Sequence, residues 1–293
     1  MRLSVVVATR NRARYVEHLL RDLAAQRKAP PFEAVIVDNA SEDDTRAVVE
    51  SAREYHAYPI RYLYEPEPNR AKARNRGIRA AEGYIVVFTD DDVALPDHFL
   101  AAHEAAHDRS NLVVGGPIVN VPSYEHRPAP TPLHWSRAFL CTCNASVPRH
   151  ALEAVGGFDE RFDLYGWEDT ELGLRLRAHG MRRRFAWDAY LWHIKPPEDA
   201  TLEVEARKAV EKARMAARFL RAAPGVRTRL ATGAHPVNVL RGRYLYGEKS
   251  LALLAGIAAS PEVPPPVRAL ARAQFLDGLY TRELATVLEH ERR

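Results

Sequence analysis

The sequence predicts an α/β protein in which helices flank a mostly parallel sheet, with a helical extension at the C-terminus. Over the first two hundred of the 293 residues, short runs of β-branched and aromatic residues alternate with amphipathic stretches of helical spacing. Beyond residue 200, apolar residues recur every three to four positions. Strand–helix–strand alternation at this spacing is typical of parallel sheets with right-handed crossovers. The apolar content of 46% and the charged content of 27% are those of an ordinary globular protein.

The alternating part contains four strand-like runs, at 3–8, 34–37, 60–64 and 84–88. The spacing of apolar residues between them predicts three helices, around 16–23, around 47–52 and from about 69 to 81. The proline-rich stretch 122–132 is expected to form a loop that either connects two elements or shapes a site.

The C-terminal part is expected to be helical at about 202–220, 240–258 and 267–288, with the prolines of 261–267 as a break. Residues 201–293 hold 16 Lys and Arg against 9 Asp and Glu, a net charge of +7, whereas residues 1–200 hold 26 against 29, a net charge of −3. A basic region of this kind can be a solvated helical surface, or can face an anionic membrane or substrate. Because it lacks interleaved aromatic residues, a nucleic-acid partner is not expected.

Cys141 and Cys143 are expected to be reduced thiols. A disulfide across one intervening residue would be strained, and no second cysteine pair completes a zinc site. The N-terminal apolar run is too short for a signal peptide, and the run 251–259 falls short of the ~20 residues that span a bilayer. The expected location is therefore the cytoplasm, with contact at the inner face of the membrane left open.

Polar residues follow three of the predicted strands. Thr9 and Arg10 follow the first, Asp38 and Asn39 the second, and three consecutive aspartates, residues 90–92, the fourth. Ligands bind outside the carboxyl ends of parallel strands, so these positions predict a binding site. Adjacent carboxylates repel one another, so the triplet either points into water or has positive charge among it. Mg²⁺ or Mn²⁺ bound to a phosphate typically takes one or two carboxylates.

The stretch NRAKARNRG, residues 69–77, predicts an anion-binding helix start. Asn69 can cap the helix and leave N–H groups free to attract a phosphate. Lys72, Arg74 and Arg76 are spaced two apart and cannot all face one ligand, and Arg74 is the candidate clamp on the anion. A basic surface helix is the alternative.

The third candidate is the pair Glu168 and Asp169, in the first turn of a helix expected to begin near Trp167. Acidic residues at a helix start are favoured by the helix dipole alone. A carboxylate beside a tryptophan, in a stretch flanked by glycines, is also well placed to act as a general base.

In their order, these segments resemble glycosyltransferase family 2 over roughly residues 3–195. The resemblance rests on VVVATRNR, VIVDNASEDDT, the N-x-x-x-A-R-N-x-G run from Asn69 to Gly77, FTDDDVALP, the segment from Asn144 to GGFDE, and WEDTELGLRLRAHG. It implies a GT-A fold with a Rossmann-like sheet. It also implies a catalytic domain at 1–198, divided into a nucleotide-binding half (1–110) and an acceptor-binding half (111–198), followed by a helical region at 199–293.

The resemblance also implies residue roles in an inverting transfer from a UDP- or GDP-sugar to an acceptor hydroxyl. The donor would be bound by a group of residues at the strand ends and on the third helix: Ala8, Thr9, Arg10, Asp38, Asn39, Arg74, Asp90 and Asp91. Asp92 is the first choice as ligand of the Mn²⁺ or Mg²⁺ ion, Asp91 the second, and His193 an additional ligand. Asp169 would be the base and Glu168 would line the acceptor side.

Two other functions fit parts of the pattern. A sugar-phosphate nucleotidyltransferase also uses a metal and aspartates, but usually has a glycine-rich loop after the first strand, and TRNRARY has no glycine. A non-catalytic module that binds nucleotide sugars or a membrane surface has little use for a base. The acceptor, whether carbohydrate, lipid or small molecule, stays open, as does pairing into a homodimer through the C-terminal helices.

Overall fold

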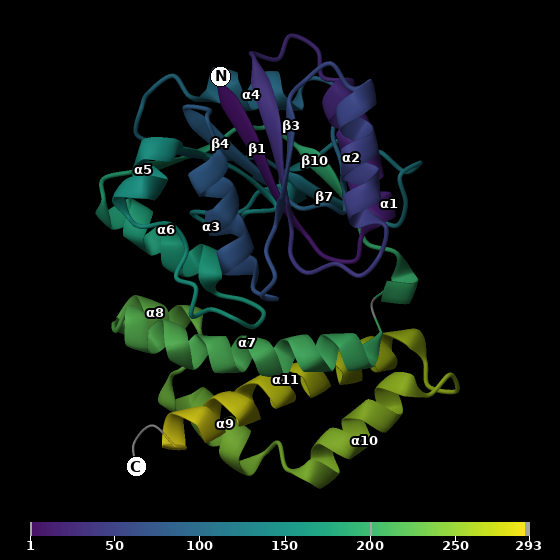
Figure 1. Cartoon of the computed structure of the whole chain (residues 1–293). Coiled ribbons are helices and arrows are strands. Elements are labelled where there is room, and N and C mark those ends of the chain that lie inside the picture. Colours follow the sequence, from purple (N-terminus) through teal and green to yellow (C-terminus); the bar gives the residue numbers. More distant parts are fainter. Residues whose placement is uncertain (1, 200, 291–293) are drawn as a thin grey trace. The chain divides into compact units, whose positions relative to one another are not determined.

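The computed structural model describes residues 2–199 and 201–290 (Figure 1). The described chain forms two compact units. The first comprises the residues up to Asp163 together with Glu168–Pro196, and the second comprises Leu164–Trp167 together with the chain from Pro197 onward. The short segment 164–167 therefore packs with the C-terminal helices, which its sequence did not predict.

The first unit is built on a seven-stranded sheet with the strand order β3-β2-β1-β4-β8-β6-β9. Its strands are β1 (Leu3–Thr9), β2 (Phe32–Asp38), β3 (Ile60–Tyr64), β4 (Ile85–Thr89), β6 (Leu112–Gly115), β8 (Asn144–Pro148) and β9 (Arg182–Phe185). The pairs β3–β2, β2–β1, β1–β4 and β6–β9 are parallel, whereas β8 runs antiparallel to β4 and β6. A small sheet of β5 (Val93–Ala94), β10 (Leu191–Ile194) and β7 (Ile118–Val121) completes the unit.

Helices cover both faces of the large sheet because alternate residues of its buried strands point to opposite sides. Leu3, Val5 and Val7 pack with α1 (Ala13–Ala24), α2 (Thr45–Tyr55) and α4 (Phe99–Ala106) on one face. The other face packs against α3 (Arg70–Ala80), α5 (Arg149–Ala154) and α6 (Glu168–Ala178), as Figure 1 shows for α3, α5 and α6. The predicted α/β architecture with a mostly parallel sheet is therefore confirmed, and the predicted strands are displaced by at most two residues at their ends.

The second unit is helical, as predicted. It contains α7 (Leu202–Ala222), α8 (Val226–Ala231), α9 (Pro236–Tyr244), α10 (Glu248–Ala259) and α11 (Pro265–His290). The long helix α11 packs against α7, α9 and α10. No helix in the described ranges is long and apolar enough to cross a bilayer.

The single helix expected over 240–258 is wrong, because the chain turns between α9 and α10. At this turn Tyr246 is buried, and its hydroxyl donates to Gln274 Oε1 at 2.9 Å. Its ring lies against Gly278 of α11, where a Cβ atom would come within 2.5 Å of Tyr246 Cδ1. Insertion of this side chain toward α11 explains why helical spacing on both sides of the turn does not produce one helix.

Candidate active site

The carboxyl ends of three adjacent strands form the base of the candidate site. β1 lies between β2 and β4 in the sheet, and Thr9 at its end is in register with Asp38 at the end of β2. The aspartate triplet follows β4 directly. The polar residues that follow the first, second and fourth strands in sequence are therefore brought to one edge of the sheet, as the strand pattern predicted.

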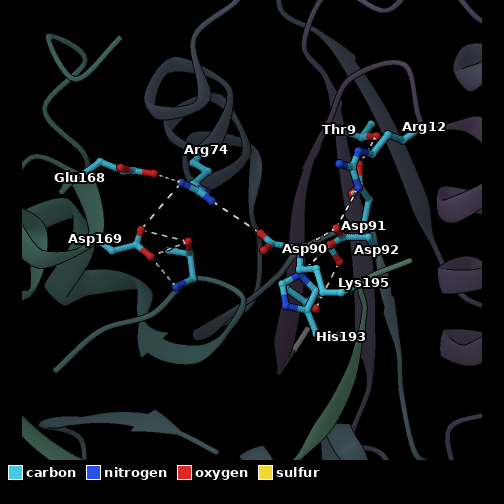
Figure 2. A network of polar contacts seen from close by, with 12 residues as sticks. Thr9, Arg12, Arg74, Asp90, Asp91, Asp92, Glu168, Asp169, His193 and Lys195 are labelled. Atoms are coloured by element: carbon cyan, nitrogen blue, oxygen red, sulfur yellow. Dashed lines mark hydrogen bonds and ion pairs between the residues drawn. The ribbon is translucent and has the colours of Figure 1, made fainter. Parts of the chain in front are cut away.

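Each aspartate of the triplet has different partners (Figure 2). Asp91 accepts a hydrogen bond from Thr9 Oγ1 at 2.7 Å. Arg12 Nη1 lies 2.8 Å from Asp92 Oδ2 and 3.5 Å from Asp91 Oδ1. Asp90 Oδ1 lies 3.6 Å from Arg74 Nη2. A positively charged side chain thus lies beside every carboxylate and offsets part of the repulsion within the triplet.

Asp92 also contacts two residues of the β10 segment. His193 Nε2 lies 3.1 Å from Asp92 Oδ1, and Lys195 Nζ lies 3.2 Å from Asp92 Oδ2. Burial raises the pKa of Asp92, but the hydrogen bond and charge of His193, with Lys195 and Arg12, outweigh burial and hold that pKa below its ordinary value. The pKa of Asp91 is raised to about 7, mainly by burial and also by the charge of Asp92. At neutral pH Asp92 is therefore fully ionised, and Asp91 is close to the midpoint of its titration.

Arg74 stands between two groups of carboxylates (Figure 2). Besides Asp90, its guanidinium lies 3.2 Å from Glu168 Oε1 and 3.8 Å from Asp169 Oδ1. Burial lowers the pKa of Arg74, but the three carboxylates raise it more, so this arginine stays charged.

The helix that carries Arg74 has the capped start that the sequence predicted. Asn69 Oδ1 accepts a hydrogen bond from Lys72 N at 3.1 Å. Lys72 pairs with Glu67, and Arg76 Nη1 lies 3.4 Å from Glu65 Oε2. The three basic residues thus have separate partners, in agreement with the expectation that they cannot all face one ligand.

Asp169 lies in the first turn of α6 and is held by Thr142. Thr142 Oγ1 lies 2.9 Å from both carboxylate oxygens, and Thr142 N donates to Oδ2 at 2.9 Å. Burial and the neighbouring charge of Glu168 raise the pKa of Asp169 to about 6, against the opposing effects of Arg74 and the Thr142 hydrogen bonds. A carboxylate with this pKa can accept a proton near neutral pH.

The remaining predicted donor-binding residues lie around the ends of β1 and β2. Asp38 is buried and accepts hydrogen bonds from Ser41 N at 2.8 Å and Tyr62 Oη at 2.7 Å. The Asn39 amide donates to the backbone carbonyls of residues 65 and 67, so only its oxygen is left for a ligand. Ala8 is partly buried and Arg10 is exposed.

Sequence reasoning missed Arg12, Lys195 and Thr142. Lys195 could have been found, because it lies two residues after His193 and alternate residues of an extended segment share a face. Arg12 belongs to the same turn as Thr9 and Arg10, but no spacing rule distinguishes it from its neighbours. Thr142 lies 27 residues before Asp169, and nothing in the sequence links the two.

The residues at the triplet fit a hard divalent cation. Octahedral ligands at about 2.1 Å from Mg²⁺ lie about 3 Å from one another, and Asp92 Oδ1 and His193 Nε2 have this separation, 3.1 Å. Asp90, Cys143 and His193 also converge, with one donor atom each within 4.8 Å of the others. Burial raises the pKa of Cys143 well above its ordinary value, so its thiol is neutral. Carboxylate and imidazole donors are therefore the suitable ligands here.

The comparisons with known proteins agree with this arrangement. Residues 4–158 match the family model of glycosyl transferase family 2, and residues 128–197 match a model described as the N-terminal domain of galactosyltransferase. Validoxylamine A glucosyltransferase from Streptomyces hygroscopicus subsp. limoneus is 30% identical over 243 residues, which cover 69% of this chain and 53% of that protein. The chain thus spans about half the length of this curated relative.

Solved structures share the fold over almost the whole chain. The mannosyltransferase PcManGT from Pyrobaculum calidifontis, in complex with GDP-Man and Mn²⁺, has a TM-score of 0.64 and 24% identity, covering 100% of this chain and 88% of its own. TarS residues 1–349 from S. aureus, in complex with UDP, has a TM-score of 0.55 and 25% identity, covering 99% of this chain and 92% of its own. With a family model that spans more than half of the sequence and a sheet of GT-A type, the chain belongs to glycosyltransferase family 2.

Proposed function

We propose that the protein is an inverting glycosyltransferase that moves a sugar from a UDP- or GDP-sugar to an acceptor hydroxyl. The observation that carries this proposal is the position of Arg74. Asp90 of the aspartate triplet, the proposed metal-binding cluster, lies on one side of its guanidinium, and Asp169 lies on the other. One largely buried cation thus lies between the carboxylates proposed to hold the metal and the diphosphate and a carboxylate whose pKa of about 6 suits a base. Relatives that bind GDP-Man or UDP support the donor class.

In the proposed reaction the acceptor oxygen forms a bond to the anomeric carbon while the bond from that carbon to the phosphate oxygen breaks. Asp169 takes the acceptor proton, and the nucleoside diphosphate leaves with the bonding electron pair. A single displacement of this kind inverts the anomeric centre. Glu168, beside Asp169 at the start of α6, would line the acceptor side.

Negative charge grows on the leaving diphosphate, and this chain supplies cations to meet it. Arg74 is largely buried, with 11% of its side chain exposed, and it is charged, so little reorganisation is needed when the charge develops. Lys195 and Arg12 reach the same carboxylates and can turn toward a phosphate. A bound Mn²⁺ or Mg²⁺, held by Asp92 and His193 with Asp90 or Asp91 nearby, would supply further positive charge at the diphosphate.

The donor side of the proposed site is formed by residues 1–110, with Ala8, Thr9, Arg10, Asp38 and Asn39 at the strand ends. Residues 111–198 would then form most of the acceptor side, and 199–293 a separate helical region. The acceptor is a carbohydrate, a lipid or a small molecule; one relative is named validoxylamine A glucosyltransferase.

Thermal unfolding of the full chain with a panel of UDP- and GDP-sugars, each with and without Mn²⁺, tests this proposal. A ligand that binds the native state raises the melting temperature. At a concentration of 100 times its Kd, it raises the free energy of unfolding by about 2.7 kcal/mol. We expect one nucleotide sugar to stabilise the protein in a Mn²⁺-dependent manner and to be slowly hydrolysed. Asp92→Asn should lose this effect, whereas Asp97→Asn, an exposed carboxylate outside the site, should keep it.

The competing nucleotidyltransferase reaction is tested in the same preparation. Incubation with a sugar phosphate and a nucleoside triphosphate would release pyrophosphate if that activity were present. Pyrophosphate release together with no response to any nucleotide sugar would overturn the proposed transfer reaction.

A further inference from the structure

An aromatic platform of Trp135, Phe185 and Trp187 lies on the acceptor half of the first unit. The Phe185 ring packs edge-on against Trp187 at 5.1 Å and against Trp135 at 6.5 Å between ring centroids. Trp135 is 47% exposed and Trp187 is 44% exposed, although both are large apolar residues. Single exposed hydrophobic residues are ordinary, but two tryptophans joined through a third ring form a contiguous apolar surface, which is typical of a binding site.

Two arginines flank this platform. The Arg183 guanidinium lies 5.7 Å from the Trp135 centroid and 5.3 Å from the Phe185 centroid, and it also donates to the Ser136 carbonyl. Arg137 lies 5.7 Å from the same Trp135 ring. Across the described ranges, neither guanidinium has a carboxylate within 4.0 Å, whereas Arg184 on the same strand pairs with Asp108 at 2.6 Å. The platform therefore has positive charge that the chain itself does not neutralise.

The platform shares a small cavity with the segment that leads to Thr142 of the candidate active site. Ser136, Arg183 and Phe185 line this cavity of about 20 Å³, and so do Phe139, Cys141 and Asn144. Cys141 directly precedes Thr142, which holds Asp169. A volume of this size has room for about one water molecule, so a sugar ring cannot enter it and must lie on the platform outside.

We propose that the platform binds the acceptor, and that the acceptor is a glycan whose sugar rings carry an anionic group. This inference rests on the glycosyltransferase function proposed above and names the substrate class of its second site. The apolar C–H face of a pyranose ring suits an exposed indole, which is rigid and amphipathic. Arginine pairs with a carboxylate or phosphate through paired N–H donors, so Arg137 and Arg183 favour a charged sugar over a neutral one.

Saturation-transfer NMR on the full chain tests this binding with two matched pairs of probes. The carboxylate arm compares trigalacturonic acid with maltotriose, and the phosphate arm compares glucose 6-phosphate with glucose. We expect saturation of the sugar ring protons for at least one anionic probe, with its neutral counterpart bound more weakly. The proposal would be overturned if neither anionic probe showed saturation transfer, or if the neutral probes showed as much saturation transfer as the anionic ones.

Variants locate the binding on the platform. Trp135→Ala/Trp187→Ala should weaken binding of the anionic probe about tenfold or more, and Arg137→Glu, which changes a single exposed side chain, should abolish the preference for the anionic probe. Tyr55→Ala is the matched aromatic control, since Tyr55 is 79% exposed on α2. Arg182→Ala is the matched arginine control, because this exposed residue alternates with Arg183 along β9. The melting transition of each variant checks that it is folded.

The outcomes separate this inference from the proposed function. If the double variant and Arg137→Glu bind the probes as the wild type does, the platform assignment is wrong, even when a nucleotide sugar stabilises the protein. If the probes bind to the platform but no nucleotide sugar has any effect with Mn²⁺, the platform is a glycan site and the transferase proposal fails instead.

Discussion

Replacing Asp169 by Asn tests the proposed base separately from the rest of the site. The amide can keep both contacts with Thr142, accepting from its N–H and donating to its hydroxyl. Arg74 keeps Glu168 at 3.2 Å and Asp90 at 3.6 Å, so no buried charge is left unpaired. The variant should therefore fold and respond to the donor. Loss of a general base should slow transfer by about 10²–10⁴-fold.

The same substitution should make the free protein more stable at neutral pH. The pKa of Asp169 is raised from 3.8 to about 6, so the folded state holds this proton more tightly than the unfolded state. The protonated Asp169 carboxyl therefore adds to the free energy of unfolding below pH 4, and this stabilisation is lost as the pH rises through 6. A shift of about two units corresponds to about 3 kcal/mol at most. The side chain is 25% exposed, so about 1–3 kcal/mol is the expected gain for Asp169→Asn at pH 7.5.

Two assays check these effects. Urea unfolding of wild type and variant at pH 4 and 7.5 should give a stability difference that appears only at the higher pH. Transfer by the wild type should rise with pH and level off above about 6, with about tenfold less activity at pH 5, where about a tenth of the groups are ionised. Near-normal transfer by Asp169→Asn, or a stability difference independent of pH, would refute the assignment of Asp169 as a base with a raised pKa.

Four further substitutions, around the site and in the helical unit, have expected outcomes. Thr142→Val removes hydrogen bonds that lower the pKa of Asp169, so the acid limb of the transfer profile should move to higher pH, as a pH–rate series would record. Lys195→Ala removes a cation from Asp92 but also one that can meet the diphosphate, so Mn²⁺ alone should bind several-fold tighter and the nucleotide sugar several-fold weaker, as calorimetric titrations would measure. Gly242→Ala would place a Cβ 2.2 Å from the Thr281 carbonyl oxygen and should lower the free energy of unfolding by about 1–3 kcal/mol. Gly256→Ala meets nothing within 4 Å in α10 and should raise it by up to about 1 kcal/mol in the same urea titration.

The features that could be predicted from the sequence are those determined by a few neighbouring residues within one strand or helix. The strand ends carry Thr9, Asp38 and Asp90 because parallel strands place their carboxyl ends at one edge. The cap at Asn69 and the orientation of Arg74 follow from helix geometry, and both are present. Three or four neighbouring residues are sufficient to determine such features.

The features that sequence missed depend on contacts between distant segments. Thr142 contacts Asp169 because β8, which follows Thr142, pairs with β4 in the sheet. This pairing is antiparallel, and no local sequence pattern predicts it. The break between α9 and α10 arises from the packing of Tyr246 against Gly278, 32 positions later in the chain. Gly247, next to Tyr246 and directly before α10, disfavours a continuous helix and is a local signal of this break that the spacing of apolar residues did not reveal.

The charges around the triplet predict how metal and donor bind together. Asp90, Asp91 and Asp92 face Arg74, Arg12 and Lys195, so the site is already close to neutral. A divalent cation alone must compete with two cations for Asp92, whereas a diphosphate alone meets three carboxylates. When both bind, Lys195 and Arg12 can move from Asp92 to the phosphates, and every charge keeps a partner.

Binding of Mn²⁺ and of UDP or GDP should therefore be cooperative. A coupling of 1–3 kcal/mol, about 5–150-fold, is the usual range, and it must be the same whichever ligand is added first. Titration of Mn²⁺ with and without the nucleotide, and of the nucleotide with and without Mn²⁺, measures both sides of this cycle. Lys195→Ala should reduce the coupling, because one of the two cations that exchange partners is gone. Equal Mn²⁺ affinity with and without nucleotide would mean that the cations on Asp92 do not move, and that the metal and the donor do not meet at this triplet.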